Sequence, residues 1–431
     1  MAFVPVYILI LGGTIIVDYF AGIYLGQAKG KSRKLILIAS LAANVGVLLV
    51  FKYYNFFLHN LSKVLVAASL ANALPFLSIL LPIGLSFHTF QAMSYTIEVY
   101  RGNQQPEKHF GIYALYVMYY PQLVAGPIER PQNLLPQLHA KQFYDFERIK
   151  AGLMQMAWGF FKKIVIADRL AQVVDYAYTD IAPQNGLTLV LATIFYSFQI
   201  FCDFSGYSDI AIGASKVMGI NLMTNFRNPY LSESISEFWS RWHISLSTWF
   251  KDYVYIPLGG NRVAVPRWYF NLFFVFVLSG FWHGANWTFL VWGALHGFYL
   301  IFAVEKEKWK KKLPWKFTLP RTLKKIIDVV ITFLLVSFAW IFFRSYDIAW
   351  AGKIIMKIST LRVSEPLLTP LSSAELWFCI ILIIGLILKE RFAFIIDTSN
   401  NLKFYGLMML LVFGIYISGV FSQNQFIYFQ F

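Results

Sequence analysis

Three of the seven histidines in the chain lie in one aromatic stretch, Trp239–Gly297. They are His243, His283 and His296, and their neighbours are mainly aromatic and aliphatic residues, glycines and a few polar groups. A neutral imidazole is one of the few side chains that can be buried at membrane depth and still move a proton near neutral pH. The stretch therefore predicts a catalytic site inside the membrane.

The surroundings of His283 favour a role in proton transfer. It follows an apolar run and lies between Gly280 and Gly284, which allow another backbone or a substrate to approach the ring closely. A histidine placed in this way can act as a general base on a hydroxyl group, a step worth ~10²–10⁴-fold in rate. A single histidine in an apolar helix is usually structural, but His243 belongs to a second motif on a different element. We therefore expect His283 and His243 to be the catalytic residues, facing each other across a tunnel.

The residues beside the two histidines are the expected substrate contacts. They are Trp282, Asn286, Arg241, Trp242 and Ser279. The segment after His243 mixes Lys251, Asp252 and Arg262 with tryptophan, which is typical of an interfacial or cavity-lining segment. No covalent nucleophile is obvious, so direct transfer is favoured. We expect no metal, because the chain has only two cysteines and both lie inside apolar runs.

The composition predicts the elements that must hold this site. Hydrophobic residues make up 58% of the chain and charged residues 14%, with a mean hydropathy of +0.56. At about 20 apolar residues per crossing, the apolar runs predict an all-α polytopic membrane protein with about ten or eleven transmembrane helices plus re-entrant and interfacial helices. We expect one integral-membrane domain, residues 1–431. The net charge of +15 lies mainly between apolar runs, which favours contacts with anionic lipid over nucleic acid.

Basic loops predict the orientation in the membrane. The N-terminal run has no basic flank and no convincing cleavage site, so we expect a retained first helix. The short basic loop at residues 27–34 is expected on the cytoplasmic side, with the N-terminus outside. The strongest basic run, residues 305–325, is expected on the same side, where it acts as a topology signal or, as the alternative, docks an acidic carrier protein or a phosphate-rich donor. Residues 424–431 are then expected outside.

Several other polar residues interrupt the apolar runs. Pro82 and Gly84 break the run before His88, which we expect to be a buried structural histidine bonded to a neighbouring helix. Asp203 and Asp209 must face the protein interior, because a lipid-exposed carboxylate is costly. For these two carboxylates structural hydrogen bonding is the favoured role, and proton relay is the alternative.

Two further segments are expected at the edge of the membrane or in re-entrant turns. Three prolines lie between residues 121 and 131 and cannot all belong to one regular helix. The segment is therefore expected to be a re-entrant turn, with Glu129 and Arg130 either as a buried pair or as a solvated surface pair. Residues 143–178 have an amphipathic pattern with Lys162 and Lys163 beside aromatic residues, which predicts a half-buried interfacial helix.

The two histidine segments together resemble the signature of the membrane-bound O-acyltransferase family. They read FWSRWHISLSTWFKDYVYIPLGG and SGFWHGANWTFLVWGALHG. Two upstream segments, LPIGLSFHTFQAMSYTIEVYRG and PQLVAGPIERP, are similar to the bacterial branch that includes the membrane subunit of alginate O-acetylation. These motifs cover about residues 80–300, and the rest of the chain matches mainly in hydropathy.

This resemblance implies a ring of helices around a funnel through a thinned membrane, with His283 of the WHG motif as the catalytic residue and His243 of the RWH motif as its partner. It also implies a cytoplasmic thioester donor, either acetyl-CoA or an acyl carrier protein, with no bound cofactor. In such systems the acyl group leaves on the outer side of the cytoplasmic membrane. A transferase resembling the SGNH hydrolases often completes delivery to a polysaccharide acceptor.

We therefore expect an O-acyltransferase that moves an acetyl group across the inner membrane for O-acylation of an extracytoplasmic polysaccharide. Transfer of D-alanyl groups to teichoic acid from a carrier protein is the alternative within the family. A proton-coupled transporter that relays protons through the histidines and Asp203 or Asp209 is the alternative from another class. A scaffold that only anchors an outer transferase is the third, and it predicts that substitution of His283 is silent.

Overall fold

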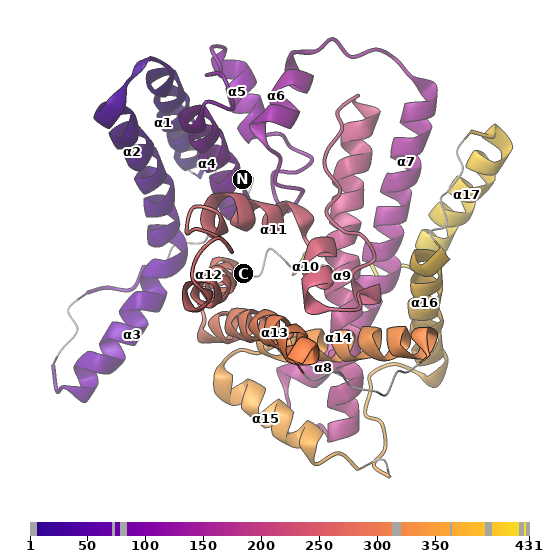
Figure 1. Cartoon of the computed structure of the whole chain (residues 1–431). Helices are drawn as coiled ribbons and strands as arrows, with labels where there is room; N and C mark the ends of the chain where they lie inside the picture. The colour runs from indigo at the N-terminus through magenta and orange to yellow at the C-terminus, as the bar shows by residue number, and fades with distance from the viewer. Residues whose placement is uncertain are drawn as a thin grey trace. The chain divides into compact units, whose positions relative to one another are not determined.

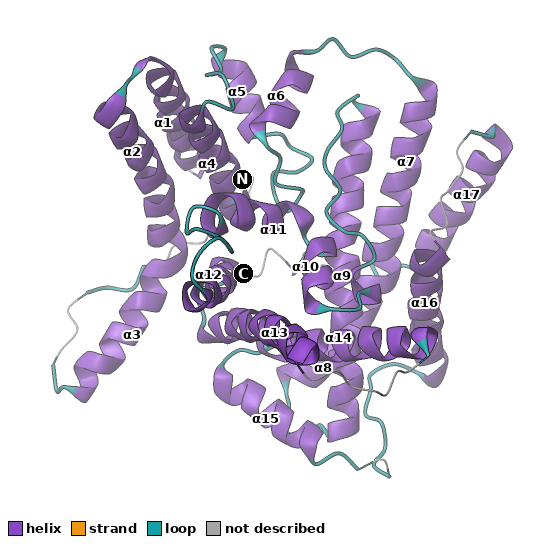
Figure 2. Ribbon diagram, in the orientation of Figure 1, coloured by secondary structure: helices purple, strands orange, loops and turns teal. Residues whose placement is uncertain are grey.

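The computed structural model describes residues 7–70, 74–77, 84–312, 320–362, 364–392, 399–421 and 426–427. All regular elements within these ranges are helices (Figure 2). The all-α class is therefore confirmed. Pro82 and most of residues 424–431 lie outside the described residues, as do residues 313–319 of the basic run. The predictions made for them are therefore not addressed by the structure.

The helices fall into two compact units. The first contains the described residues up to Gly152 together with Ala211–Met223, and the second contains Leu153–Ile210 and the described residues from Thr224 onwards. Figure 1 labels the helices. The first unit holds α1 (Tyr7–Gln27), α2 (Gly30–Leu48), the π-helix η1 (Leu49–Tyr53), α3 (Tyr54–Ala67), α4 (Leu85–Arg101), α5 (Phe110–Val117), α6 (Pro131–His139) and the start of α7 (Phe146–Phe160).

The second unit carries the predicted site. Its helices are the π-helix η2 (Phe161–Ala167), α8 (Asp168–Thr179), most of α9 (Gly186–Val217), the 3-10 turn η3 (Pro229–Leu231), α10 (Ile235–Arg241), α11 (Ile244–Phe250), the π-helix η4 (Lys251–Tyr255), α12 (Val265–His283), α13 (Trp287–Lys312), α14 (Arg321–Arg344), α15 (Ile348–Ser359), α16 (Ser373–Phe392) and α17 (Asn401–Ser418). The end of α7 also belongs to this unit.

Six of the described helical segments are long and apolar enough to cross a membrane. They are Ile8–Gln27, Gly30–Ala67, Gly186–Val217, Trp287–Trp309, Arg321–Arg344 and Asn401–Ser418. The sequence estimate of about ten or eleven crossings also counts apolar runs that fall in other helices, such as α16. On α17 the side chains of Leu402, Met409, Phe413 and Tyr416 are all more than half exposed. Apolar faces of this extent are expected on helices whose surroundings are lipid.

The first unit buries polar groups between α1, α2 and α4, which pack against one another. Asp18 of α1 is fully buried and accepts hydrogen bonds from Ser40 (2.6 Å) and Asn44 (2.8 Å) of α2. His88 of α4 lies within 3.4 Å of the Thr14 hydroxyl of α1. The predicted burial of His88 and its bond to a neighbouring helix are thus confirmed.

The proline-rich segment before α6 is non-helical, and Pro131 begins α6 at a position where the missing N–H costs nothing. Glu129 is only 1% exposed, so the prediction of a solvated surface pair is wrong. Its carboxylate accepts hydrogen bonds from the Asn133 side chain at 2.6 Å and from the Met223 backbone. Hydrogen bonds within the unit therefore hold this buried acidic group.

The second unit contains a buried network of ion pairs between η2, α8 and α9. Lys162 pairs with Asp209 at 2.6 Å, and Lys163 pairs with Asp203 at 2.6 Å and with Asp168 at 2.8 Å. The two lysines are only 5% and 7% exposed, so they do not form a solvated polar face. That residues 143–178 lie at the membrane interface stays a prediction. The structural role favoured for Asp203 and Asp209 agrees with these contacts.

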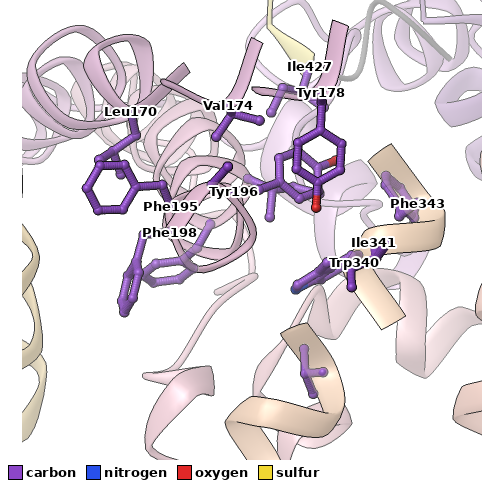
Figure 3. Close-up of a cluster of buried hydrophobic side chains, with 14 of the residues drawn as sticks. Leu170, Val174, Tyr178, Phe195, Tyr196, Phe198, Trp340, Ile341, Phe343 and Ile427 are labelled. Atoms are coloured by element: carbon purple, nitrogen blue, oxygen red, sulfur yellow. The ribbon is translucent and has the colours of Figure 1, made fainter. Parts of the chain in front are cut away.

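The main apolar core of the second unit joins α8, α9, α13 and α14. Figure 3 shows Tyr178 of α8 and Tyr196 of α9 together with Trp340, Ile341 and Phe343 of α14. All five side chains are at most 3% exposed. This aromatic packing fixes the end of α14, which forms one wall of the site described next.

Candidate active site

His283 is the last residue of α12 and is only 5% exposed. Its ring centroid lies 4.8 Å from that of Trp282, 5.2 Å from that of Trp292 on α13, and 5.2 Å from that of Phe343 on α14. Three helices of the second unit therefore position the imidazole. The enclosure of the imidazole is aromatic on all three of these sides.

Glycines bring α12 and α13 close enough to hold His283 in this place. A side chain at Gly280 would collide with the Phe289 carbonyl of α13, and one at Gly293 would collide with the Phe276 carbonyl of α12. Gly284 faces the ring of Phe289. The expectation that glycine admits another backbone is therefore confirmed, and it applies to helix–helix packing. The spacing of four residues between Gly280 and Gly284, repeated on α13, is the sequence signal of this contact.

His243 lies between α10 and α11 and is 1% exposed. Its backbone has φ +43°, a left-handed conformation that is uncommon for residues other than glycine. Asn225 stabilises the turn: its carbonyl accepts from Ile244 N at 2.9 Å, and its side-chain oxygen accepts from the hydroxyl of Ser245 at 2.9 Å. The His243 ring packs edge-on against Phe204 with a centroid distance of 4.5 Å.

The two predicted catalytic histidines have different aromatic neighbours. His243 contacts Phe204 and Phe226, whereas His283 contacts the aromatic side chains of α12, α13 and α14 named above. Stacked tryptophans connect the two regions: Trp242 contacts Trp340 at 5.3 Å, and Trp340 stacks on Trp292 at 5.7 Å. That the two rings face each other across a tunnel stays a prediction.

A cavity of about 350 Å³ lies among α10, α11, η4, α12 and α13. Its lining is mainly apolar, with the hydroxyl groups of four serines, one threonine and one tyrosine, and with one lysine, Lys251. The residues of α12 that line it are Leu272, Val275, Phe276 and Ser279. These positions form one face of the helix, and the next position on that face is His283, one turn after Ser279. His283, a predicted catalytic residue, therefore lies on the same side of α12 as the residues that line the cavity.

Trp239 of α10 also lines the cavity and is bonded to the third histidine of the stretch. Its indole N–H donates to Nδ1 of His296 at 3.2 Å. His296 lies on α13 and is fully buried. The sequence placed His296 near the site without giving it a role, because its partner lies 57 residues away in the chain.

The five predicted substrate contacts lie in different environments. Ser279 lines the cavity, and Trp282 packs against His283. Trp242 is buried in the core and stacks on Phe238, while Arg241 pairs with Glu237 of its own helix. Asn286 donates to the Tyr346 carbonyl at 2.7 Å and accepts from Thr288 N at 3.1 Å.

Ser279 is thus open to the cavity, whereas the amide of Asn286 joins the start of α13 to the loop after α14. Their roles as substrate contacts stay predictions. Within the described residues no group of three or more histidine, cysteine or acidic side chains is arranged to hold a metal ion. The arrangement brings together an apolar cavity, hydroxyl groups and an enclosed imidazole.

Comparison with known proteins identifies the family. The model of the membrane-bound O-acyltransferase family matches residues 108–346, more than half of the chain, and this range includes His243 and His283. A peptidoglycan O-acetyltransferase of Helicobacter pylori is 37% identical over 376 residues, which cover 81% of this chain and 69% of the relative. A probable alginate O-acetylase of Pseudomonas aeruginosa is 39% identical over 350 residues, covering 80% of this chain and 65% of the relative.

A more distant relative is the teichoic acid D-alanyltransferase of Bacillus subtilis, which is 30% identical over 276 residues, covering 61% of this chain and 68% of the relative. The chain thus spans about two thirds of the length of the curated relatives it matches.

Proposed function

Because this chain belongs to the membrane-bound O-acyltransferase family of enzymes, we propose that it transfers an acetyl group from a thioester donor to a hydroxyl acceptor. The two relatives with 37% and 39% identity are named for O-acetylation of peptidoglycan and alginate, and the D-alanyltransferase is less similar at 30%. Acetyl transfer for O-acylation of an extracytoplasmic polysaccharide is therefore the preferred assignment. D-alanyl transfer to teichoic acid is the second.

In the proposed reaction His283 acts as the general base. Its neutral imidazole takes the proton of the acceptor hydroxyl while the oxygen attacks the thioester carbonyl. The carbon–sulfur bond then breaks, and the leaving thiolate takes the proton back from the imidazolium, so the ring is regenerated. His243 orients or stabilises the reacting groups. The observation that supports this proposal is that α12 lines the cavity up to Ser279 and that His283 follows one helical turn later on the same side of the helix.

The proposed donor is acetyl-CoA or an acyl carrier protein thioester on the cytoplasmic side of the inner membrane. The proposed route ends on the outer side, where a transferase resembling the SGNH hydrolases completes delivery to the polysaccharide. We also propose that residues 1–431 act as one integral-membrane domain. The transporter alternative loses its main support, because Asp203 and Asp209 are engaged with Lys163 and Lys162.

The test is acyl transfer by purified His283→Ala and His243→Ala in detergent or proteoliposomes, with labelled acetyl-CoA or acyl carrier protein as the donor. We expect His283→Ala to lose at least ~10²-fold in thioester turnover, with a melting temperature close to that of the wild type. His59→Ala is the matched control, because His59 is exposed on α3. Wild-type turnover by His283→Ala would remove the histidine from the mechanism.

A further inference from the structure

Trp239 forms a wall of the cavity that cannot easily move. Its indole is 8% exposed and packs edge-on against Phe276 at 5.1 Å and against Trp292 at 5.7 Å. The hydrogen bond to His296 also restricts rotation of the indole about the side-chain bonds of Trp239. Contacts from α12 and α13 therefore hold a side chain that comes from α10.

His296 can serve as the acceptor in only one state. An indole nitrogen is a donor only, so Nδ1 of His296 must accept, and the neutral ring carries its proton on Nε2. Aromatic rings surround this imidazole, including Trp239 and Trp292 with centroids at 5.0 Å each and Tyr299 at 5.7 Å. A doubly protonated ring has no free lone pair on Nδ1 and could not accept this bond.

Trp239 and His283 have a neighbour in common, which bears on the part that Trp239 can play in substrate binding. Trp292 contacts both residues, with centroid distances of 5.7 Å to Trp239 and 5.2 Å to His283. Ser279, which also lines the cavity, lies one turn before His283 on α12. A thioester carbonyl bound between His283 and Ser279 would direct its acyl group towards the part of the cavity that Ser279, Val275 and Trp239 line.

We propose that Trp239 limits the length of the acyl group that the enzyme accepts, and that His296 is the positioning residue that holds Trp239 in place. This inference rests on the proposed acyl transfer. Each additional methylene must fit beside an indole that is held from three sides, and one methylene in such a pocket changes kcat/KM by ~10–200-fold. A smaller or mobile side chain at position 239 should admit longer acyl groups.

The test compares acetyl, propionyl and butyryl thioesters as donors and measures kcat/KM for each. We expect the butyryl-to-acetyl ratio to rise by at least ~10-fold in Trp239→Leu. It should also rise in His296→Leu, which removes the acceptor, and return close to the wild-type value in His296→Asn, whose side-chain oxygen can replace Nδ1. Trp309→Leu is the matched control, because Trp309 is 57% exposed on the same helix as His296.

Ratios of two donors are insensitive to a general loss of stability, which a purely structural role would cause. Trp239→Phe keeps a ring against Phe276 and carries the test should Trp239→Leu fail to fold. This inference would be overturned if the wild type transfers acetyl groups but the butyryl-to-acetyl ratio of kcat/KM is unchanged in the Trp239 variants and in His296→Leu. The proposed acyl transfer would still stand after that result. A wild type that transfers no acyl group from any donor would instead overturn the proposed function.

Discussion

Replacing Gly280 with alanine tests whether close packing of α12 against α13 positions His283. A Cβ at this position would lie far inside the contact distance of the Phe289 carbonyl oxygen, and 3.2 Å from Gly293 Cα. Both obstacles are backbone atoms, so rotation of a side chain cannot relieve the collision. The two helices must move apart, and Gly280 is only three residues before His283.

The expected cost follows from this geometry. Overpacking of one added carbon costs about 1–3 kcal/mol in stability. Opening of the helix pair by the order of 1 Å would also move the imidazole, and a displacement of that size can lower a rate about 100-fold. We therefore expect Gly280→Ala to reduce acyl transfer more strongly than it reduces stability.

Gly385→Ala provides a matched control. Gly385 lies inside α16, and a Cβ there would have no atom within 4 Å. Because alanine is about 1 kcal/mol better than glycine within a helix, this variant should be as stable as the wild type or slightly more stable. Melting temperature and thioester turnover are measured for both variants. Equal activity in Gly280→Ala and Gly385→Ala would refute the reasoning.

Two further predictions concern charged groups. Lys163→Met leaves two carboxylates, one of them Asp203, buried without their cation, and should lower the free energy of unfolding by about 3–5 kcal/mol. Lys324→Met is the control: its side chain is 60% exposed, and its loss should lower the free energy of unfolding by only ~0–1 kcal/mol. Chemical denaturation measures both, and similar values would contradict the buried ion-pair network. Burial raises the pKa of Glu129 above its ordinary value of 4.5, so the folded state holds this proton more tightly than the unfolded state. Stability should therefore decrease as pH rises from 4.5 towards the raised pKa, and Glu129→Gln should flatten this part of the stability–pH curve. A slope that Glu129→Gln leaves unchanged would assign the effect to other groups.

The sequence predicted the features that depend on neighbouring residues. Long apolar runs predicted the helices and the membrane class, because hydropathy and helical period are read within a few turns. Prolines predicted the break between α5 and α6 for the same reason. The motifs around His243 and His283 predicted the family, which the comparison confirmed. The roles of the two histidines stay predictions.

The sequence did not predict which groups pair with the buried polar side chains. Lys162 and Lys163 looked like residues of a membrane surface, because an amphipathic pattern does not show whether its polar face meets water or another helix. Their carboxylate partners on α9 lie 40 or more residues away in the chain.

His296 shows the same limit. Its local pattern gave it no function, and only the packing of α10 against α13 brings Trp239 within hydrogen-bonding distance. The sequence by itself therefore determined which segments become helices and which family the chain belongs to. The tertiary structure decided which side chains share a cavity or an ion pair, because burial and partner choice depend on contacts between residues far apart in the chain.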